Sequence, residues 1–227
     1  DLANITYENF LQAVYLLYKS ADSDIKNLAN SYLYKFEESS EAWDISVQVL
    51  NTTGLNEEAY YNASQIIKKK LRYDFSEHAN NEIVLGNLAN FLIEKVSSYK
   101  DHMLYLLSNI CKCFSLLSIF AHKQFPDIIK QIVLKLNNED MRSLMALLLI
   151  FNYMPENITN KNELVIDDEY RTSYESFLSN IAEDVIIFLD FLIKKINANK
   201  SELIKKDPNM VSLFRLMNKN VYIFKFR

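Results

Sequence analysis

The sequence predicts an all-α fold, a right-handed α-solenoid of about five HEAT-type helix pairs. Glycine and proline are scarce, with 2 and 3 copies among 227 residues, so the chain lacks the residues that the turns of a sheet protein need. Apolar residues recur instead at helical spacing, in paired segments that begin roughly every 35–45 residues, close to HEAT and armadillo repeats. Because each helix is too thin to bury its own apolar face, neighbouring pairs must stack.

The first predicted pair spans residues 6–38. Thr6 can cap a helix that runs to Tyr18, because its hydroxyl can accept from a free N–H of the first turn. Asp22 or Asp24 can cap the next helix in the same way. We expect two apolar stripes to face inward, formed by Phe10, Val14, Leu17 and Tyr18 in the first helix and by Ile25, Leu28, Ala29, Tyr32, Leu33 and Phe36 in the second.

The second predicted pair spans residues 40–75. Ser39 or Ser40 starts its first helix. Gly54 follows that helix at a position that favours a left-handed residue, and Asn56–Phe75 forms the second helix. The residues expected to face inward are Trp43, Val47 and Leu50, then Ala59, Ala63, Ile66 and Ile67, with Lys70 burying only its aliphatic stem.

Three further pairs follow, at residues 80–121, 125–154 and 169–217. Pro126 suits the first turn of a helix. The fourth pair closes near Pro155, and the polar stretch Glu156–Asp168 is expected to be a loop. Pro208 bends or breaks the last helix. Because the apolar Val221–Phe226 needs another helix to cover it, we expect the 227 residues to form a single N-terminal fragment of a longer solenoid.

Composition narrows the function classes. A net charge of −4 argues against a sequence-independent nucleic-acid binder, which is usually basic. The most apolar run, Met141–Tyr153, falls short of the ~20 residues that span a bilayer, so we expect no membrane insertion. Cys111 and Cys113 lie roughly 200° apart around a predicted helix, which favours two reduced core thiols over a shared bond or metal.

Motifs for catalysis or cofactor binding are lacking. The histidines His78, His102 and His122 are scattered and lack the spacing of a metal site. Gly54 and Gly86 are too few for a phosphate-binding loop. We therefore expect a binding protein without enzyme activity, catalytic residues, metal or cofactor.

Four residues stand in a fairly specific order in the second to fourth predicted helices. Ala29 and Phe36 are seven positions apart, Trp43 follows a break, and Ala63 opens the run Ala-Ser-Gln-Ile-Ile-Lys-Lys-Lys-Leu. In this order, residues 25–75 resemble the N-terminal domain of the importin-β (karyopherin) superfamily. We expect the four residues to be structural core, with Trp43 a packing residue and not a ligand-stacking one.

The resemblance is closest to the transportin-SR subgroup. Ala13–Tyr18 is similar to the end of its first helix, and Ala42–Ser46 and Lys68–Lys70 are similar to its next two motifs. Downstream, Tyr153–Glu156 is similar to a Leu-Pro-Glu-Glu corner and Leu213–Arg215 to a Val-Phe-Arg segment. The chain departs from the pattern at Asn87, at Gln124 and Phe125, and in its final segment.

This resemblance implies the N-terminal part of a nuclear transport receptor that moves between cytoplasm and nucleus. Members of the family bind Ran-GTP on the inner, second helices of their first repeats and release or acquire cargo accordingly. The implied partners are Ran-GTP, nucleoporins and protein cargo, with Arg/Ser-rich splicing-type proteins as the implied cargo class. The cargo surface lies largely in C-terminal repeats that this chain lacks.

The helix at Asn56–Phe75 gives the sharpest site hypothesis. Tyr61, Gln65, Lys68 and Arg72 fall within about 60° of one another, opposite the apolar side. An aromatic anchor with a row of donors could meet the switch region of a GTPase, whose order depends on the γ-phosphate. The alternative is an ordinary solvated helix face. A second candidate group, on the preceding pair, includes Asp24 and Asn27.

The alternative function is a non-transport α-solenoid adaptor or scaffold for protein–protein interaction. Such a protein shares the helical periodicity and lacks any dependence on Ran. The order of Ala29, Phe36, Trp43 and Lys68 argues for the transport receptor.

Overall fold

The structure, a computed structural model, describes residues 4–75, 80–98, 104–136, 141–159 and 166–198. All regular structure in these ranges is helical: α1 (Tyr7–Lys19), α2 (Ser23–Glu38), α3 (Ala42–Asn51), α4 (Glu57–Tyr73), α5 (Glu82–Ser98), α6 (Leu104–Ala121), α7 (Ile128–Leu136), α8 (Met141–Thr159) and α9 (Asp168–Ala198). The predicted α-solenoid is confirmed. Expectations for other segments lie outside the described residues: the helix at 200–217 with Pro208, Leu213–Arg215, Val221–Phe226, His78 and His102.

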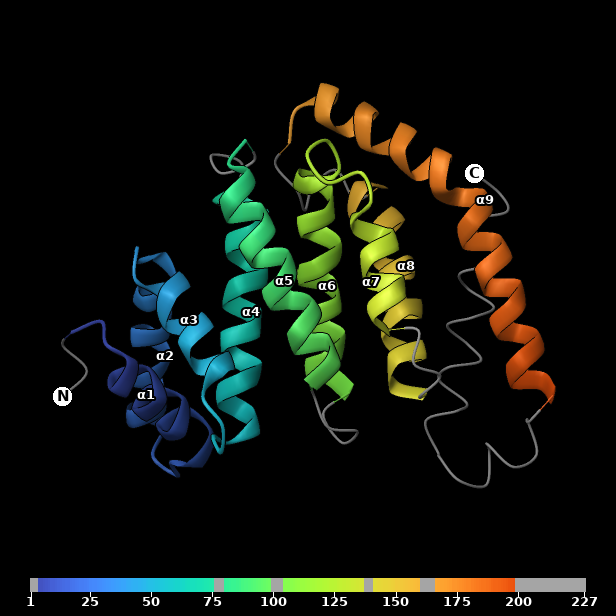
Figure 1. Cartoon of the computed structure of the whole chain (residues 1–227). Helices are drawn as coiled ribbons and strands as arrows, with labels where there is room; N and C mark the ends of the chain where they lie inside the picture. Colours follow the sequence, from blue (N-terminus) through green and yellow to red (C-terminus); the bar gives the residue numbers. More distant parts are fainter. Residues whose placement is uncertain (1–3, 76–79, 99–103, 137–140, 160–165, 199–227) are drawn as a thin grey trace.

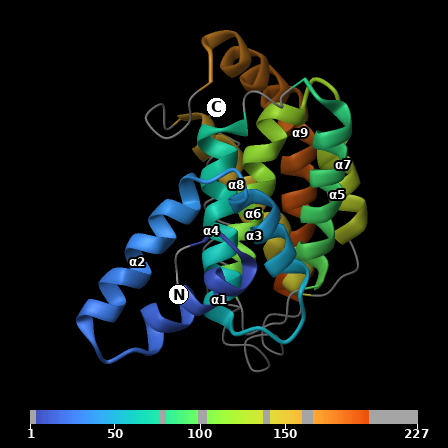
Figure 2. The ribbon, with the colours of Figure 1, turned by 90° about the vertical axis from the view of Figure 1, so that its left-hand side faces the viewer.

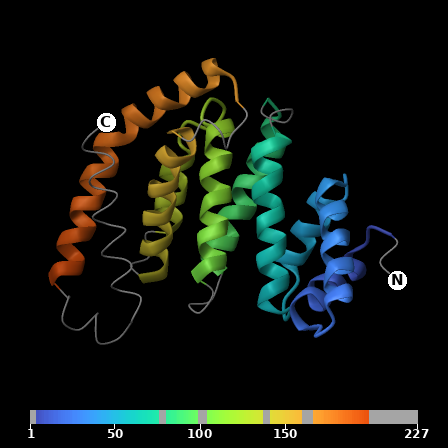
Figure 3. The same cartoon turned by 180° about the vertical axis from the view of Figure 1, so that it is seen from behind.

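The helices pair with their sequence neighbours and stack in two layers. α1 packs with α2, α3 with α4, α5 with α6, and α7 with α8. α4, α6 and α8 lie side by side and form one layer (Figure 3). α5 and α7 form the second layer, which packs on the other side of the first (Figure 1). The second helices of successive pairs therefore form one continuous face.

The first pair is oriented differently from the others. α1 packs on α4, while α2 projects away from the stack (Figure 2). α2 buries a narrow stripe, in which the rings of Phe36 and Phe10 lie 4.7 Å apart. The prediction that Ile25 and Leu28 face inward is wrong, because α2 packs mainly on α1 and leaves them 38% and 61% exposed. Tyr18 is likewise exposed.

Local caps start the helices largely as predicted. The Thr6 hydroxyl accepts from the Asn9 amide at 3.2 Å, and the side chains of Asp22 and Asn56 cap α2 and α4. The prediction that Ser39 or Ser40 starts α3 is wrong, since α3 begins at Ala42. The Ser39 hydroxyl instead donates to a carbonyl in the last turn of α2.

The buried side of α3 is shifted by one residue from the predicted one. Its buried residues are Ala42, Ser46, Val49 and Leu50. Trp43 and Val47 are half-buried at the edge of this side, and Trp43 stacks on Phe75 with ring centroids 5.9 Å apart. Gly54 has φ +83°, the left-handed conformation that the sequence predicts.

Two prolines differ from their predicted roles. Pro126 lies in a turn two residues before α7 and not within its first turn. α8 continues through Pro155 for another turn, so the predicted break there is wrong. Tertiary contacts hold this extra turn, because Asn157 donates to the hydroxyl of Ser115 on α6 at 2.6 Å and Ile158 is buried.

The first turns of α9 pack against the C-terminal end of α6. α9 then crosses the end of the stack and bends downward beyond α7 and α8 (Figure 1). The Tyr174 and Ser118 hydroxyls lie 2.6 Å apart in the core. His122 is buried beside them, where Nδ1 donates to the Ile119 carbonyl at 2.7 Å and Nε2 lies 2.8 Å from the Ser173 hydroxyl. The carbonyl contact requires the Nδ1–H tautomer, so the Ser173 hydroxyl donates to Nε2.

His122 makes the stability of the protein depend on pH. Burial lowers its pKa below the ordinary 6.5, the Ile119 carbonyl raises it, and Lys123 lowers it further. Above pH 6.5 both folded and unfolded forms are neutral, whereas below it the unfolded chain takes up the proton first, so stability falls. We expect the urea midpoint to drop between about pH 7.5 and about pH 5.5 more in the wild type than in His122→Gln. An equal drop in both proteins would contradict this assignment.

Candidate protein-binding surface

The four residues predicted on α4 lie on one face, and the side chains of three of them are joined by hydrogen bonds. Gln65 Nε2 donates to the Tyr61 hydroxyl at 2.8 Å, and the Lys68 ammonium donates to Gln65 Oε1. These bonds follow from i,i+4 and i,i+3 spacing on a helix. The row is less exposed than predicted, because all four side chains, Arg72 included, are half-buried. It is an ordered network and not a loose solvated face.

α6 extends this network through Tyr105. The rings of Tyr61 and Tyr105 meet edge-on with centroids 5.5 Å apart. The Tyr105 hydroxyl donates to a carboxylate oxygen of Glu57, at the start of α4, at 2.5 Å. Burial and the Glu57 carboxylate raise the pKa of Tyr105, so its hydroxyl stays protonated as a donor. These contacts fix α4 and α6 side by side at their N-terminal ends.

The same face continues from α6 onto α8. The hydroxyls of Ser108 and Tyr153 lie 2.8 Å apart. The ammonium of Lys112, one turn further along α6, lies 4.9 Å from the centroid of the Tyr153 ring. We call this surface the inner face; it consists of Tyr61, Gln65, Lys68, Arg72, Tyr105, Ser108, Lys112 and Tyr153.

Sequence reasoning missed the contributions of Tyr105 and Lys112 to the inner face. The available signal is the spacing of Tyr105, Ser108 and Lys112, which places all three on one side of a helix. This spacing is hard to recognise because these three residues lie within the long apolar run of α6. Tyr153 appeared only as part of a family-like corner, although α8 continues past it.

Buried polar groups lie directly beneath the inner face. Asn109 donates to the Ser64 hydroxyl at 3.2 Å, which links α6 to α4. Cys113 contacts the Ser64 carbonyl at 3.7 Å, while Cys111 contacts the Ala146 carbonyl on α8 at 3.6 Å. The two thiols therefore point to opposite neighbours, and both are free and fully buried, as predicted for core thiols.

The remaining predicted residues occupy two environments. Ala29, Phe36 and Ala63 are fully buried, as a structural core requires. Asp24 and Asn27 are exposed on α2, a helix that packs mainly on α1 and is tied to α4 by the ion pair of Glu37 with Lys69 at 2.9 Å. The structure does not bring these two residues together with the α4 row.

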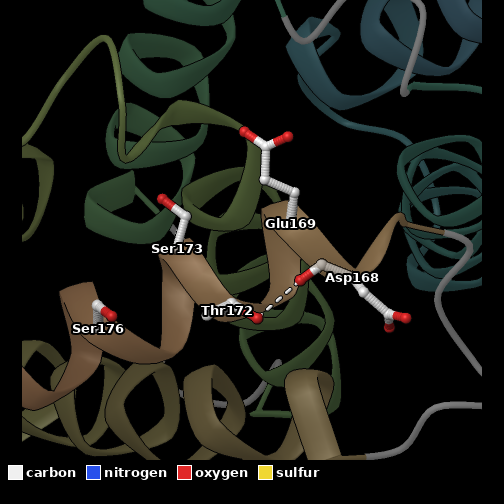
Figure 4. Close-up of a pocket in the computed structure, with 5 residues that line it drawn as sticks. All are labelled: Asp168, Glu169, Thr172, Ser173 and Ser176. Atoms are coloured by element: carbon white, nitrogen blue, oxygen red, sulfur yellow. Dashed lines mark hydrogen bonds between the residues drawn. The ribbon is translucent and has the colours of Figure 1, made fainter.

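A shallow groove runs along the first turns of α9. It is lined by Asp168, Glu169, Thr172, Ser173 and Ser176, and the Thr172 hydroxyl donates back to the Asp168 carbonyl at 2.8 Å (Figure 4). Across the described ranges, no three His, Cys, Asp or Glu side chains are grouped so as to hold a metal ion. None of the described helices has the length and apolarity to cross a membrane.

The chain is similar to distant relatives among known proteins. No family model matches the chain. It is 30% identical over 112 residues to an uncharacterized protein of Schizosaccharomyces pombe, an alignment covering 49% of this chain and 12% of that protein. It is 26% identical over 230 aligned positions to the mRNA transport regulator MTR10 of Saccharomyces cerevisiae, covering 97% of this chain and 22% of that protein. The chain thus spans between about an eighth and about a fifth of the length of these relatives.

These comparisons support the coarser part of the sequence interpretation. Nearly the whole chain aligns with a transport regulator, and the described residues form a helical solenoid. Both findings agree with the resemblance to the importin-β superfamily that the sequence motifs indicate. They do not distinguish the transportin-SR subgroup from its relatives.

Proposed function

We propose that this chain is the N-terminal, Ran-GTP-binding portion of a nuclear transport receptor of the importin-β type. Its role is protein binding and not catalysis. The receptor would shuttle between cytoplasm and nucleus, contact nucleoporins, and carry protein cargo, with Arg/Ser-rich proteins as the proposed class. The similarity to a transport regulator supports the transport class.

One observation carries the Ran-GTP proposal. The second helices of three successive pairs form a continuous face in which tyrosine and cationic side chains are held in place by one another. Tyrosine and arginine are enriched at protein interfaces, and a side chain that its neighbours already hold in place loses little conformational entropy on binding. The face is thus prepared for a folded protein partner.

Ran-GTP would act by shifting the shape of the solenoid. If Ran-GTP binds one curvature of the solenoid better than another, it changes the affinity of the receptor for cargo. Cargo then changes the affinity of the receptor for Ran-GTP by the same factor. Selectivity for the GTP form requires only that the partner's switch loops differ between nucleotide states.

The test is capture of the 227-residue chain by Ran locked in its GTP form and, separately, in its GDP form. We expect selective capture by Ran-GTP, because only the ordered switch region would match the inner face. A longer parent protein serves as the positive control. Capture by neither form while the parent binds would contradict Ran-GTP recognition by these repeats and leave the receptor class in place. Equal capture by both forms, or no capture of either the chain or the parent, would favour the adaptor or scaffold.

A further inference from the structure

The inner face carries three cationic side chains on two neighbouring helices. Lys68 and Arg72 come from α4 and Lys112 from α6. Burial raises the pKa of Cys113 to about 12, and the charges of Lys68, Arg72 and Lys112 all act against this rise. Cys113 Sγ lies 3.7 Å from the carbonyl of Ser64, which is one turn before Lys68, so Lys112, the neighbour of Cys113, lies on the part of α6 that packs beside these turns of α4. We call Lys68, Arg72 and Lys112 the positive centre of the inner face.

Lys112 is the member of this centre whose position is set from the third helix. Its ammonium lies 4.9 Å from the centroid of the Tyr153 ring, and the Tyr153 hydroxyl lies 2.8 Å from that of Ser108. Ser108 and Lys112 are one turn apart on α6, so Tyr153 bridges both. Lys112 is half-buried and thus pays less side-chain entropy on meeting a partner than a fully solvated lysine would.

We propose that Lys112 is a specificity-determining contact of the inner face, which accepts an acidic segment of the GTP-bound protein partner, and that Tyr153 and Ser108 are its positioning residues. This inference rests on the proposed function and adds the chemistry of the partner. It extends the predicted row from α4 across α6 to α8.

Charge and neighbours favour an acidic protein segment as the occupant. An acidic segment that lies across this face can accept charge-assisted hydrogen bonds from Lys112 on α6 and from Lys68 or Arg72 on α4. The flanking Tyr61 and Tyr105 rings supply the apolar contact that a peptide segment needs. Single-stranded RNA could use similar groups, but it carries a negative charge at every nucleotide, so a chain of net charge −4 opposes it more than it opposes a short acidic segment.

The experiment measures the affinity of Ran-GTP for the full chain with Lys112→Gln, Lys112→Arg and Tyr153→Phe. We expect Lys112→Gln to weaken binding about tenfold and to flatten its salt dependence. Lys112→Arg should restore most of the affinity. Tyr153→Phe keeps the ring and loses the Ser108 contact, so a smaller loss of about threefold is expected. The matched control is Lys130→Gln. Lys130 is exposed on α7, in the layer opposite the inner face, so this variant should bind as the wild type does.

The outcomes separate this inference from the proposed function. Wild type that selects Ran-GTP, with Lys112→Gln binding equally well, overturns the role of Lys112 and leaves the function intact. Wild type that does not select Ran-GTP overturns both. Binding of a single-stranded RNA oligonucleotide that is lost in Lys112→Gln and kept in Lys130→Gln would replace the acidic protein segment by a nucleic acid. Equal melting temperatures of all variants exclude a folding defect.

Discussion

Replacing Phe36 by alanine is expected to lower the free energy of unfolding by about 3–5 kcal/mol. Phe36 is fully buried, with its ring 4.7 Å from that of Phe10 on α1 and 6.3 Å from that of Tyr32. The narrow contact between α1 and α2 offers few other apolar groups that could fill the resulting cavity. The measurement is urea unfolding followed by circular dichroism.

The matched control for this change is Tyr34→Ala on the same helix. Tyr34 is 61% exposed, so its removal should change stability by less than about 0.5 kcal/mol. A loss below about 1 kcal/mol for Phe36→Ala would show that α2 contributes little to the cooperative unit. Because α2 projects from the stack, local loss of α2 is the expected first step of unfolding in the variant (Figure 2).

Reversing two charges of the α4 row, Lys68→Glu with Arg72→Glu, is expected to reduce the affinity for Ran-GTP at least about 100-fold. Both side chains lie on the inner face and both act electrostatically on Cys113, so their replacement turns the positive centre negative. An acidic partner segment would then meet like charges at short range. The measurement is a titration of Ran-GTP at fixed salt.

The control reverses the same number of charges on the opposite layer, with Lys130→Glu and Lys135→Glu on α7. Both lysines are exposed, so net charge changes equally while the inner face stays intact. We expect this control to bind within about twofold of the wild type, since exposed charges further away than the Debye length of ~10 Å are screened. Similar losses in both double variants would mean that net charge, and not the inner face, governs binding.

Local chemistry explains the parts of the fold that sequence alone predicts well. The Asn56 side chain accepts from the Ala59 amide at 2.9 Å, a bond that needs no other part of the chain. Gly54 adopts φ +83° because a residue without Cβ takes that conformation at low cost. Both signals act within a few residues, so they can be read from sequence.

Burial of particular side chains is less predictable because it depends on which helices meet. Leu28 belongs to the apolar stripe of α2 and is nonetheless 61% exposed, whereas Ala29 beside it is fully buried. The apolar stripe of α2 extends around about half of the helix, and only the part of it that contacts α1 is buried. Pro155 shows the same limit, since packing of α8 against α6 overrides its tendency to end a helix.

The candidate site follows the same division. Helical spacing placed Tyr61 and Lys68 on one side of α4, because 100° per residue fixes which side chains share a face. Spacing cannot tell that Tyr105 and Tyr153, from segments about 45 residues apart in successive pairs, lie beside this row.

The sequence by itself determined the helical class, the caps at Thr6, Asp22 and Asn56, and the stacking of neighbouring helices into a solenoid, since these follow from hydrogen bonds and periodicity within short segments. Only the tertiary structure decided that α1 packs on α4, that α2 stands apart, and that three helices join their tyrosine and cationic side chains into one face. The physical reason is that stacking free energy depends on the fit between apolar surfaces of different helices, and this fit is a property of pairs that no single segment encodes.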